Sequence, residues 1–142
     1  MNHNLEFEKL VQYDAGKSGI SLNVELRLGK DSTTFEAKVD TGSTYCIFER
    51  IYGEKLGIEI ETGLREKIIT ANSFFWAFAH IVTLVVEDYK FDSTVYFAQD
   101  ESFNRNVLGR HGWLDRVIVG INDYDGKLYL NRYESGIRLT EM

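Results

Sequence analysis

The sequence predicts an all-β, barrel-like domain with one or two short helices. Its clearest element is the segment 20–28, in which apolar and polar residues alternate strictly, as in a strand with one buried face. Most other apolar runs are also short, rich in strand-forming residues and bounded by turn formers. Only the segments 49–56 and 111–116 have helical features. Many short strands with few helices are typical of a sandwich or a barrel rather than an α/β fold.

The first two strands form a predicted hairpin. Turn-forming residues at 29–32 separate the strand at 20–28 from a second strand-forming run at 33–39. Because the second run has apolar residues at every other position, it is also expected to have one buried face. Asp40 follows directly at the carboxyl end of this strand.

A helix and a long hairpin follow. The helix at 49–56 is expected to end at Gly57, a residue type that commonly terminates helices. The runs at 64–70 and 74–87 consist of strand formers on either side of residues 71–73, so they predict a long hairpin. The aromatic residues directly after this tip are compatible with core packing or with a lid that closes over an extended ligand.

The last third of the chain also consists mainly of strands. A strand at 91–98 is expected after a turn, and a short helix is expected at 111–116. Strands at 117–121 and 128–130 flank Asp125-Gly126, which is a strong signal for a hairpin turn.

Size and composition restrict the class of protein. The 142 residues suffice for one domain, which we divide into an N-terminal arm (1–19), a main domain (20–133) and a C-terminal tail (134–142). The arm has no clear period and is expected to pair at a sheet edge or an interface. Cys46 is the only cysteine, which excludes an internal disulfide and a Cys-rich zinc site and fits a reducing compartment.

Composition also limits the partners. The N-terminus has no signal-peptide layout, and no apolar run approaches the roughly 20 residues of a membrane span. The formal charge of −6 and the absence of a Lys/Arg stripe argue against nucleic acid. We therefore expect a cytoplasmic protein that binds no nucleic acid, membrane, metal or cofactor.

The string Asp40-Thr41-Gly42-Ser43 is the strongest candidate for chemistry. It places a carboxylate in a tight turn at the end of a strand, where Gly42 permits close approach of another chain. The hydroxyls of Thr41 and Ser43 can hydrogen-bond a carboxylate or nearby backbone and fix its orientation. A simple structural turn is the alternative interpretation of these four residues.

Four other features are better explained as structural. Gly16-Lys17-Ser18 resembles the end of a phosphate-binding loop, but Val11 stands where such a loop needs glycine. The acids within 122–126 fit a turn better than a calcium loop, which needs a downstream Glu. Cys46 is expected to be a small buried residue, and His80 a core or interface histidine without metal-ligand partners.

Two segments together resemble the retropepsin-type aspartic proteases, single-lobe relatives of pepsin found in retroviruses and as stand-alone bacterial proteins. The segment 39–43, Val-Asp-Thr-Gly-Ser, is similar to the family's apolar-Asp-Thr/Ser-Gly-Ser/Ala catalytic loop. The segment 107–110, Val-Leu-Gly-Arg, resembles the apolar-apolar-Gly-Arg segment that runs beneath that loop. The two are 69 positions apart, from 40 to 109, with a long hairpin between them, as in the family. The resemblance covers residues 20–133.

The chain departs from the family pattern in two places. Retroviral members have an acid four residues after the catalytic one, whereas this chain has Thr44, so the usual partner of Arg110 is absent. Their flap tip is rich in glycine, whereas residues 71–73 contain none. These differences concern the role of Arg110 and the opening of the flap.

The resemblance implies a closed acid-protease barrel with a flap hairpin and assigns roles to particular residues. Asp40 is the expected catalytic acid, supported by Thr41, Gly42 and Ser43. The other implied residues bind substrate in the flap or underlie the active site: Ala71, Asn72, Ser73, Phe74 and Phe75 in the flap, and Leu108, Gly109 and Arg110 beneath the loop.

Peptide hydrolysis by water needs one group that accepts a proton and another that donates one. One chain offers a single acid of this kind and no internal repeat, so chemistry and resemblance both predict a homodimer in which the Asp40 residues face each other. Two adjacent carboxylates cannot both ionise cheaply, so the pair is expected to share one proton, with activity favoured at mildly acidic pH. The expected activity is therefore that of an aspartic endopeptidase acting on peptides or proteins.

Two alternatives are retained. In the first, the chain is a non-catalytic, dimeric β-barrel that binds a peptide or partner, and Asp40 is a structural acid. A hydrolase that uses Cys46 and His80 is the more distant alternative.

Overall fold

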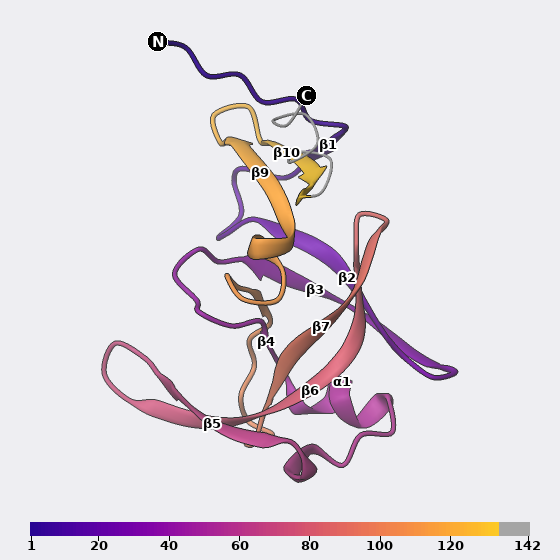
Figure 1. The fold of residues 1–142 in the computed structure, drawn as a ribbon. Coiled ribbons are helices and arrows are strands. Elements are labelled where there is room, and N and C mark those ends of the chain that lie inside the picture. The colour runs from indigo at the N-terminus through magenta and orange to yellow at the C-terminus, as the bar shows by residue number, and fades with distance from the viewer. Residues whose placement is uncertain (134–142) are drawn as a thin grey trace.

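The computed structural model describes residues 1–133; the predicted C-terminal tail, 134–142, lies outside the described residues (Figure 1). The described residues form ten strands, one α-helix and two 3-10 turns. The strands are β1 (Lys9–Gln12), β2 (Ser21–Leu28), β3 (Asp31–Val39), β4 (Ile47–Phe48), β5 (Leu64–Ile69), β6 (Phe74–Val86), β7 (Tyr89–Ala98), β8 (Val107–Leu108), β9 (Val117–Asn122) and β10 (Lys127–Arg132). The helical elements are α1 (Arg50–Lys55), η1 (Ile60–Thr62) and η2 (Leu114–Arg116).

Strand pairing closes a barrel. β2 pairs with β3 on one side and with β6 on the other, and β6 continues into β7. The gap between β7 and β3 is bridged by the two short strands: β4 runs parallel to β7, β8 runs parallel to β3, and β4 and β8 pair with each other. The circuit returns to its start, which confirms the predicted all-β barrel. β5 pairs only with β6 among the described strands, so it forms a free sheet edge.

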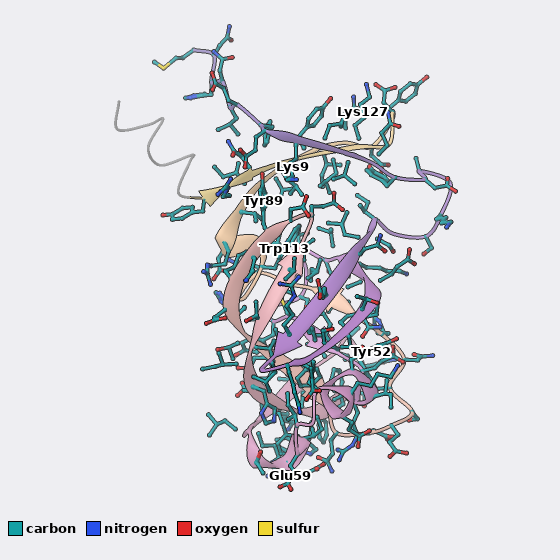
Figure 2. The ribbon with its side chains drawn as sticks, turned by 90° about the vertical axis from the view of Figure 1, so that its right-hand side faces the viewer. Lys9, Tyr52, Glu59, Tyr89, Trp113 and Lys127 are labelled. Carbon is teal, nitrogen blue, oxygen red and sulfur yellow. The ribbon has the colours of Figure 1, made fainter. Side chains whose placement is uncertain are left out.

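The barrel core follows from the alternation in the strands. In β2 the side chains of Leu22, Val24 and Leu26 are buried, as the sequence predicts. Each fully buried side chain of this size contributes about 1.5–3 kcal/mol of transfer free energy. Side chains from the two bridging strands and from the segment after β8 fill the same core, among them Phe48, Leu108 and Trp113. Figure 2 shows Trp113 inside the molecule, between the barrel and the smaller sheet.

The N-terminal arm contributes a strand to a second sheet. β1 pairs with β10, and β10 pairs with β9, in the order β1-β10-β9 at one end of the molecule (Figure 1). The Asn131 amide donates a hydrogen bond of 2.8 Å to the Glu6 carbonyl, and the Phe7 ring lies where a side chain at position 120 would project. The expected edge pairing of the arm therefore occurs within its own chain.

The second predicted helix is shorter than expected. The segment 111–116 forms only the single 3-10 turn η2, because Gly112 has a φ of +114° and the buried Trp113 also lies outside the helical region. The strand predicted at 91–98 begins two residues earlier. The preceding turn needs only Glu87 and Asp88, which both have positive φ, as in the tight turns that join antiparallel strands. No helix within residues 1–133 is long and apolar enough to cross a bilayer.

Candidate active site

Asp40 lies in a hydrogen-bonded turn directly after β3. Its backbone N–H donates to the Leu108 carbonyl at 3.0 Å, which continues the pairing of β3 with β8. The Gly42 N–H donates to Oδ1 of Asp40 at 2.9 Å, and the Ser43 N–H donates to the Asp40 carbonyl at 3.2 Å. The carboxylate is therefore oriented by its own turn. Its second oxygen, Oδ2, has no hydrogen-bond partner among residues 1–133.

Thr41 and Ser43 differ in their contacts. Thr41 is exposed, and within the described residues its hydroxyl makes no hydrogen bond. The Ser43 hydroxyl donates to the Tyr45 carbonyl at 2.7 Å and so supports the far end of the turn. Neither hydroxyl contacts the Asp40 carboxylate, although the sequence allows such a bond.

The segment after β8 lies against the turn and hydrogen-bonds to it. The Arg110 N–H donates to the Ser43 carbonyl at 2.9 Å, and the His111 N–H donates to the Thr44 carbonyl at 2.8 Å. The Gly109 backbone packs so tightly against the chain at Tyr45 that an added Cβ would lie 2.1 Å from the Tyr45 carbonyl oxygen. Only glycine fits at this crossing, and Leu108 beneath it is completely buried.

The side chain of Arg110 has no acidic partner in this arrangement. It is exposed, and it makes no ion pair within residues 1–133. The neighbouring Thr44 offers its carbonyl to His111 but no carboxylate. Arg110 therefore supports the turn through its backbone N–H.

The predicted flap is the β5–β6 hairpin, which projects from the barrel (Figure 1). The residues at its tip, Ala71, Asn72 and Ser73, are all exposed. Phe75 packs against Phe103 of the loop after β7, with 4.6 Å between ring centroids, whereas Phe74 is 49% exposed. The sequence left core packing and a lid open as roles for these aromatic residues. Phe75 packs in the structure, whereas Phe74 lies on the open surface.

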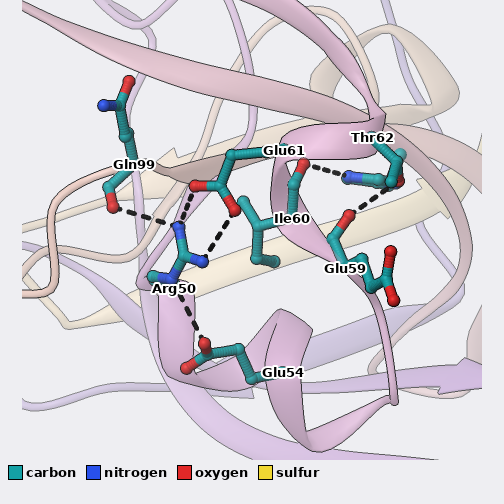
Figure 3. A network of polar contacts seen from close by, with 8 residues as sticks. Arg50, Glu54, Glu59, Ile60, Glu61, Thr62 and Gln99 are labelled. Carbon is teal, nitrogen blue, oxygen red and sulfur yellow. Dashed lines mark hydrogen bonds and ion pairs between the residues drawn. The ribbon is translucent and has the colours of Figure 1, made fainter.

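The base of this hairpin is fastened to α1 by Arg50 (Figure 3). Its guanidinium donates two hydrogen bonds to the Glu61 carboxylate, one to Glu54 at 3.2 Å, and one to the Gln99 carbonyl at 3.2 Å. These hydrogen bonds raise the pKa of Arg50 and lower the pKa of Glu61. The base of the hairpin is therefore held in place, whereas its tip makes no side-chain hydrogen bond or ion pair within residues 1–133.

A groove of about 300 Å³ lies between the Asp40 turn and β5. The Tyr45 hydroxyl reaches across it and donates to Oε1 of Glu66 at 3.4 Å. Burial, together with the Glu66 charge, raises the pKa of Tyr45. The lining comes from the turn, the following strand and the flap: Gly42, Ser43, Thr44, Tyr45, Ile47, Glu66, Lys67, Ile68 and Ile69.

Most of these lining residues were not predicted from the sequence. Glu66 and Ile68 belong to a strand that is remote in sequence from the turn, and only the folded barrel places it there. Tyr45 lies five positions after Asp40 but reads as part of an apolar run. The alternation of side chains along a strand is the sequence signal that could have shown which β5 residues share a face, among them Glu66 and Ile68.

Cys46 and His80 do not form a catalytic pair. Cys46 is fully buried, and its sulfur lies 4.0 Å from the Gly109 carbonyl oxygen. His80 is half-buried, with Nε2 2.8 Å from the Ile60 carbonyl oxygen, which requires a protonated Nε2 as the donor. Both residues have the structural environments that the sequence suggests. Across residues 1–133, no three His, Cys, Asp or Glu side chains gather in a way that would hold a metal ion.

Comparison with known proteins defines the fold. No protein-family model matches the sequence, and no curated protein sequence matches it significantly. A retropepsin-like aspartic protease from Rickettsia conorii superposes with a TM-score of 0.65 at 15% identity, covering 92% of this chain and 98% of that one. The chain has the retropepsin fold. The EIAV protease complexed with the inhibitor HBY-793 superposes with a TM-score of 0.54 at 17% identity, covering 70% of this chain and 88% of that one.

The tight crossing at Gly109 gives a first prediction. Gly109→Ala forces a methyl group into the backbone of the Asp40 turn and should lower the free energy of unfolding by about 1–3 kcal/mol or more. Urea denaturation measures this loss. Gly16→Ala is the control, because its Cβ would meet only the Asp14 side chain at 3.2 Å, and it should leave stability nearly unchanged. Equal stability of the two variants would contradict the role given to Gly109.

The environment of Cys46 gives a second prediction. Burial raises the pKa of its thiol to about 12, so the reactive thiolate is scarce at pH 8 and the sulfur is also shielded. Alkylation by iodoacetamide should be slow in the native protein and fast in urea, as followed by intact mass. Rapid labelling of the native protein would contradict this description and revive the cysteine hydrolase.

Proposed function

We propose that the chain is an aspartic endopeptidase in which Asp40 residues from two identical subunits form the catalytic pair. The observation that carries the proposal is the Asp40 turn, whose carboxylate is oriented by the Gly42 N–H and supported from below by the Gly109 segment, within a retropepsin fold. In this arrangement Oδ2 of the acid has no partner among residues 1–133, so it is available to accept or donate a proton.

The proposed reaction uses the pair as combined base and acid. One carboxylate takes a proton from a water molecule while the water oxygen forms a bond to the peptide carbonyl carbon. The other carboxyl gives its proton to the carbonyl oxygen, which yields a neutral tetrahedral intermediate. The C–N bond then breaks as the first carboxyl gives the proton it took from water to the amide nitrogen. The second carboxylate takes a proton from one hydroxyl of the intermediate as the product carboxylic acid forms, so the pair again shares a single proton.

A second copy of the chain supplies the second acid. Among residues 1–133, Asp14 has the same local geometry as Asp40, because the Gly16 N–H donates to its Oδ1 at 2.9 Å. However, Asp14 lies in an exposed loop of the arm and is not followed by a hydroxyl residue and glycine. Twofold symmetry with Asp40 at the axis provides two equivalent acids.

The substrate is proposed to be an extended peptide. Among the described strands β5 is a free edge next to the groove, and its backbone can pair with an added strand. The exposed tip at 71–73 and Phe74 would then cover the peptide and limit the access of water. A cytoplasmic setting belongs to the same proposal, because the single cysteine is buried as a free thiol.

Replacement of the acid tests the proposal. Asp40→Asn keeps the turn geometry but cannot accept a proton, so cleavage of denatured casein between about pH 4 and 7 should fall by about a hundredfold or more. Asp14→Asn, which alters the same local turn elsewhere, should retain full activity.

Circular dichroism should show that both variants remain folded. Full activity in Asp40→Asn would refute the proposed role of this acid. An inactive wild-type chain that nevertheless binds extended peptides would favour the alternative, a peptide-binding module of the same fold.

A further inference from the structure

The groove beside the Asp40 turn has a defined chemical character. Much of its lining is polar, but Ile47, which is buried, and the Tyr45 ring and Ile68, which are half-buried, give it an apolar strip. Among the described residues that line it, the one acidic group is Glu66, which accepts a long hydrogen bond from the Tyr45 hydroxyl. The site therefore combines an apolar strip with a carboxylate placed to one side.

Within residues 1–133, the one cationic side chain in the lining, that of Lys67, is directed elsewhere. Successive side chains of a strand point to opposite faces, so Lys67 points away from the face that carries Glu66 and Ile68. Its ammonium lies 4.2 Å from the centroid of the Phe74 ring and is held there by a cation–π contact. Lys67 does not neutralise Glu66, and the two have no ion pair.

Glu66 also has unused capacity to accept hydrogen bonds. Its single side-chain partner in the described part of the chain is the Tyr45 hydroxyl, at the long distance of 3.4 Å to Oε1. A carboxylate has about four lone-pair sites, so most of those on Glu66 have no partner within residues 1–133. A substrate group with several N–H donors would fill these sites, whereas a neutral apolar side chain would exclude water and leave the charge without a partner.

We propose that this groove selects a lysine or arginine side chain of the substrate, with Glu66 as the specificity-determining residue. The aliphatic stem lies along Ile47, Ile68 and the Tyr45 ring, and the cationic head reaches Glu66 in a charge-assisted hydrogen bond. The net charge of −6 favours the approach of a basic peptide. This inference rests on the proposed function for its reaction but concerns the choice of substrate.

Cleavage-site profiling tests the inference. Wild-type protein, Glu66→Gln and Glu66→Lys each digest denatured casein, and mass spectrometry identifies the bonds cut. In the wild type, Lys and Arg should be favoured over Asp and Glu by about tenfold at one position flanking the cleaved bond. Glu66→Gln should lose this preference, and Glu66→Lys should reverse it toward acidic residues.

A matched control separates local charge from total charge. Glu36→Gln removes one exposed carboxylate from β3 and changes the net charge equally, so it should keep the wild-type preference. Cleavage by the wild type without enrichment of basic residues would overturn the inference and leave the protease proposal intact. The same conclusion would follow if Glu66→Gln kept the enrichment.

Absence of any cleavage would overturn the proposed function instead, and binding then decides the inference. Fluorescence polarisation would compare an extended labelled peptide containing one lysine with the same peptide containing glutamate. Tighter binding of the lysine peptide, lost in Glu66→Gln, would support the groove as a basic-residue site. Equal affinities for the two peptides would reject it.

Discussion

The close crossing of the Gly109 segment beneath the Asp40 turn is the constraint on which the rest of the site depends. A backbone approach this tight is possible only without a side chain at position 109, and it lets two N–H groups bind the carbonyls of Ser43 and Thr44. These bonds tie β8 to the end of β3, so the turn belongs to the barrel wall. The orientation of the Asp40 carboxylate is consequently set by buried structure.

The β5–β6 hairpin, which is the proposed flap, combines a fixed base with an exposed tip. Arg50 joins α1, Glu61 and the Gln99 carbonyl at the base, whereas residues 71–73 at the tip are exposed. A hairpin held in this way can close over a bound peptide while keeping the register of β5 beside the groove. The same register places Glu66 and Ile68 on the groove face, which links the geometry of the flap to the proposed choice of substrate.

Much of the fold could be predicted because short segments of the sequence specify many of its strands and turns. The alternation in 20–28 predicts β2, and the turn formers predict the hairpins that the structure confirms. The Asp40 string and the Gly109 segment are likewise short patterns, readable without knowing how they meet. The prediction of a helix at 111–116 was wrong because Gly112 has a positive φ, which follows from its packing against Cys46 and Ser93. A local sequence pattern contains no information about that packing.

The groove could not be predicted for a related reason. Tyr45 and Glu66 are 21 residues apart, and they meet only because β5 projects from β6 above the turn. The pairing of β1 with β10 joins the two ends of the described chain in the same way. Such contacts depend on closure of the barrel, which no local propensity specifies.

The central claim is that one chain holds half of an active site. Wild-type protein unfolded and refolded together with increasing amounts of the Asp40→Asn variant tests it most directly, with activity expressed per wild-type chain. If each site needs Asp40 from both subunits, this activity should fall in proportion to the fraction of variant chains in the mixture. Activity per wild-type chain that stays constant at every ratio would contradict the shared site.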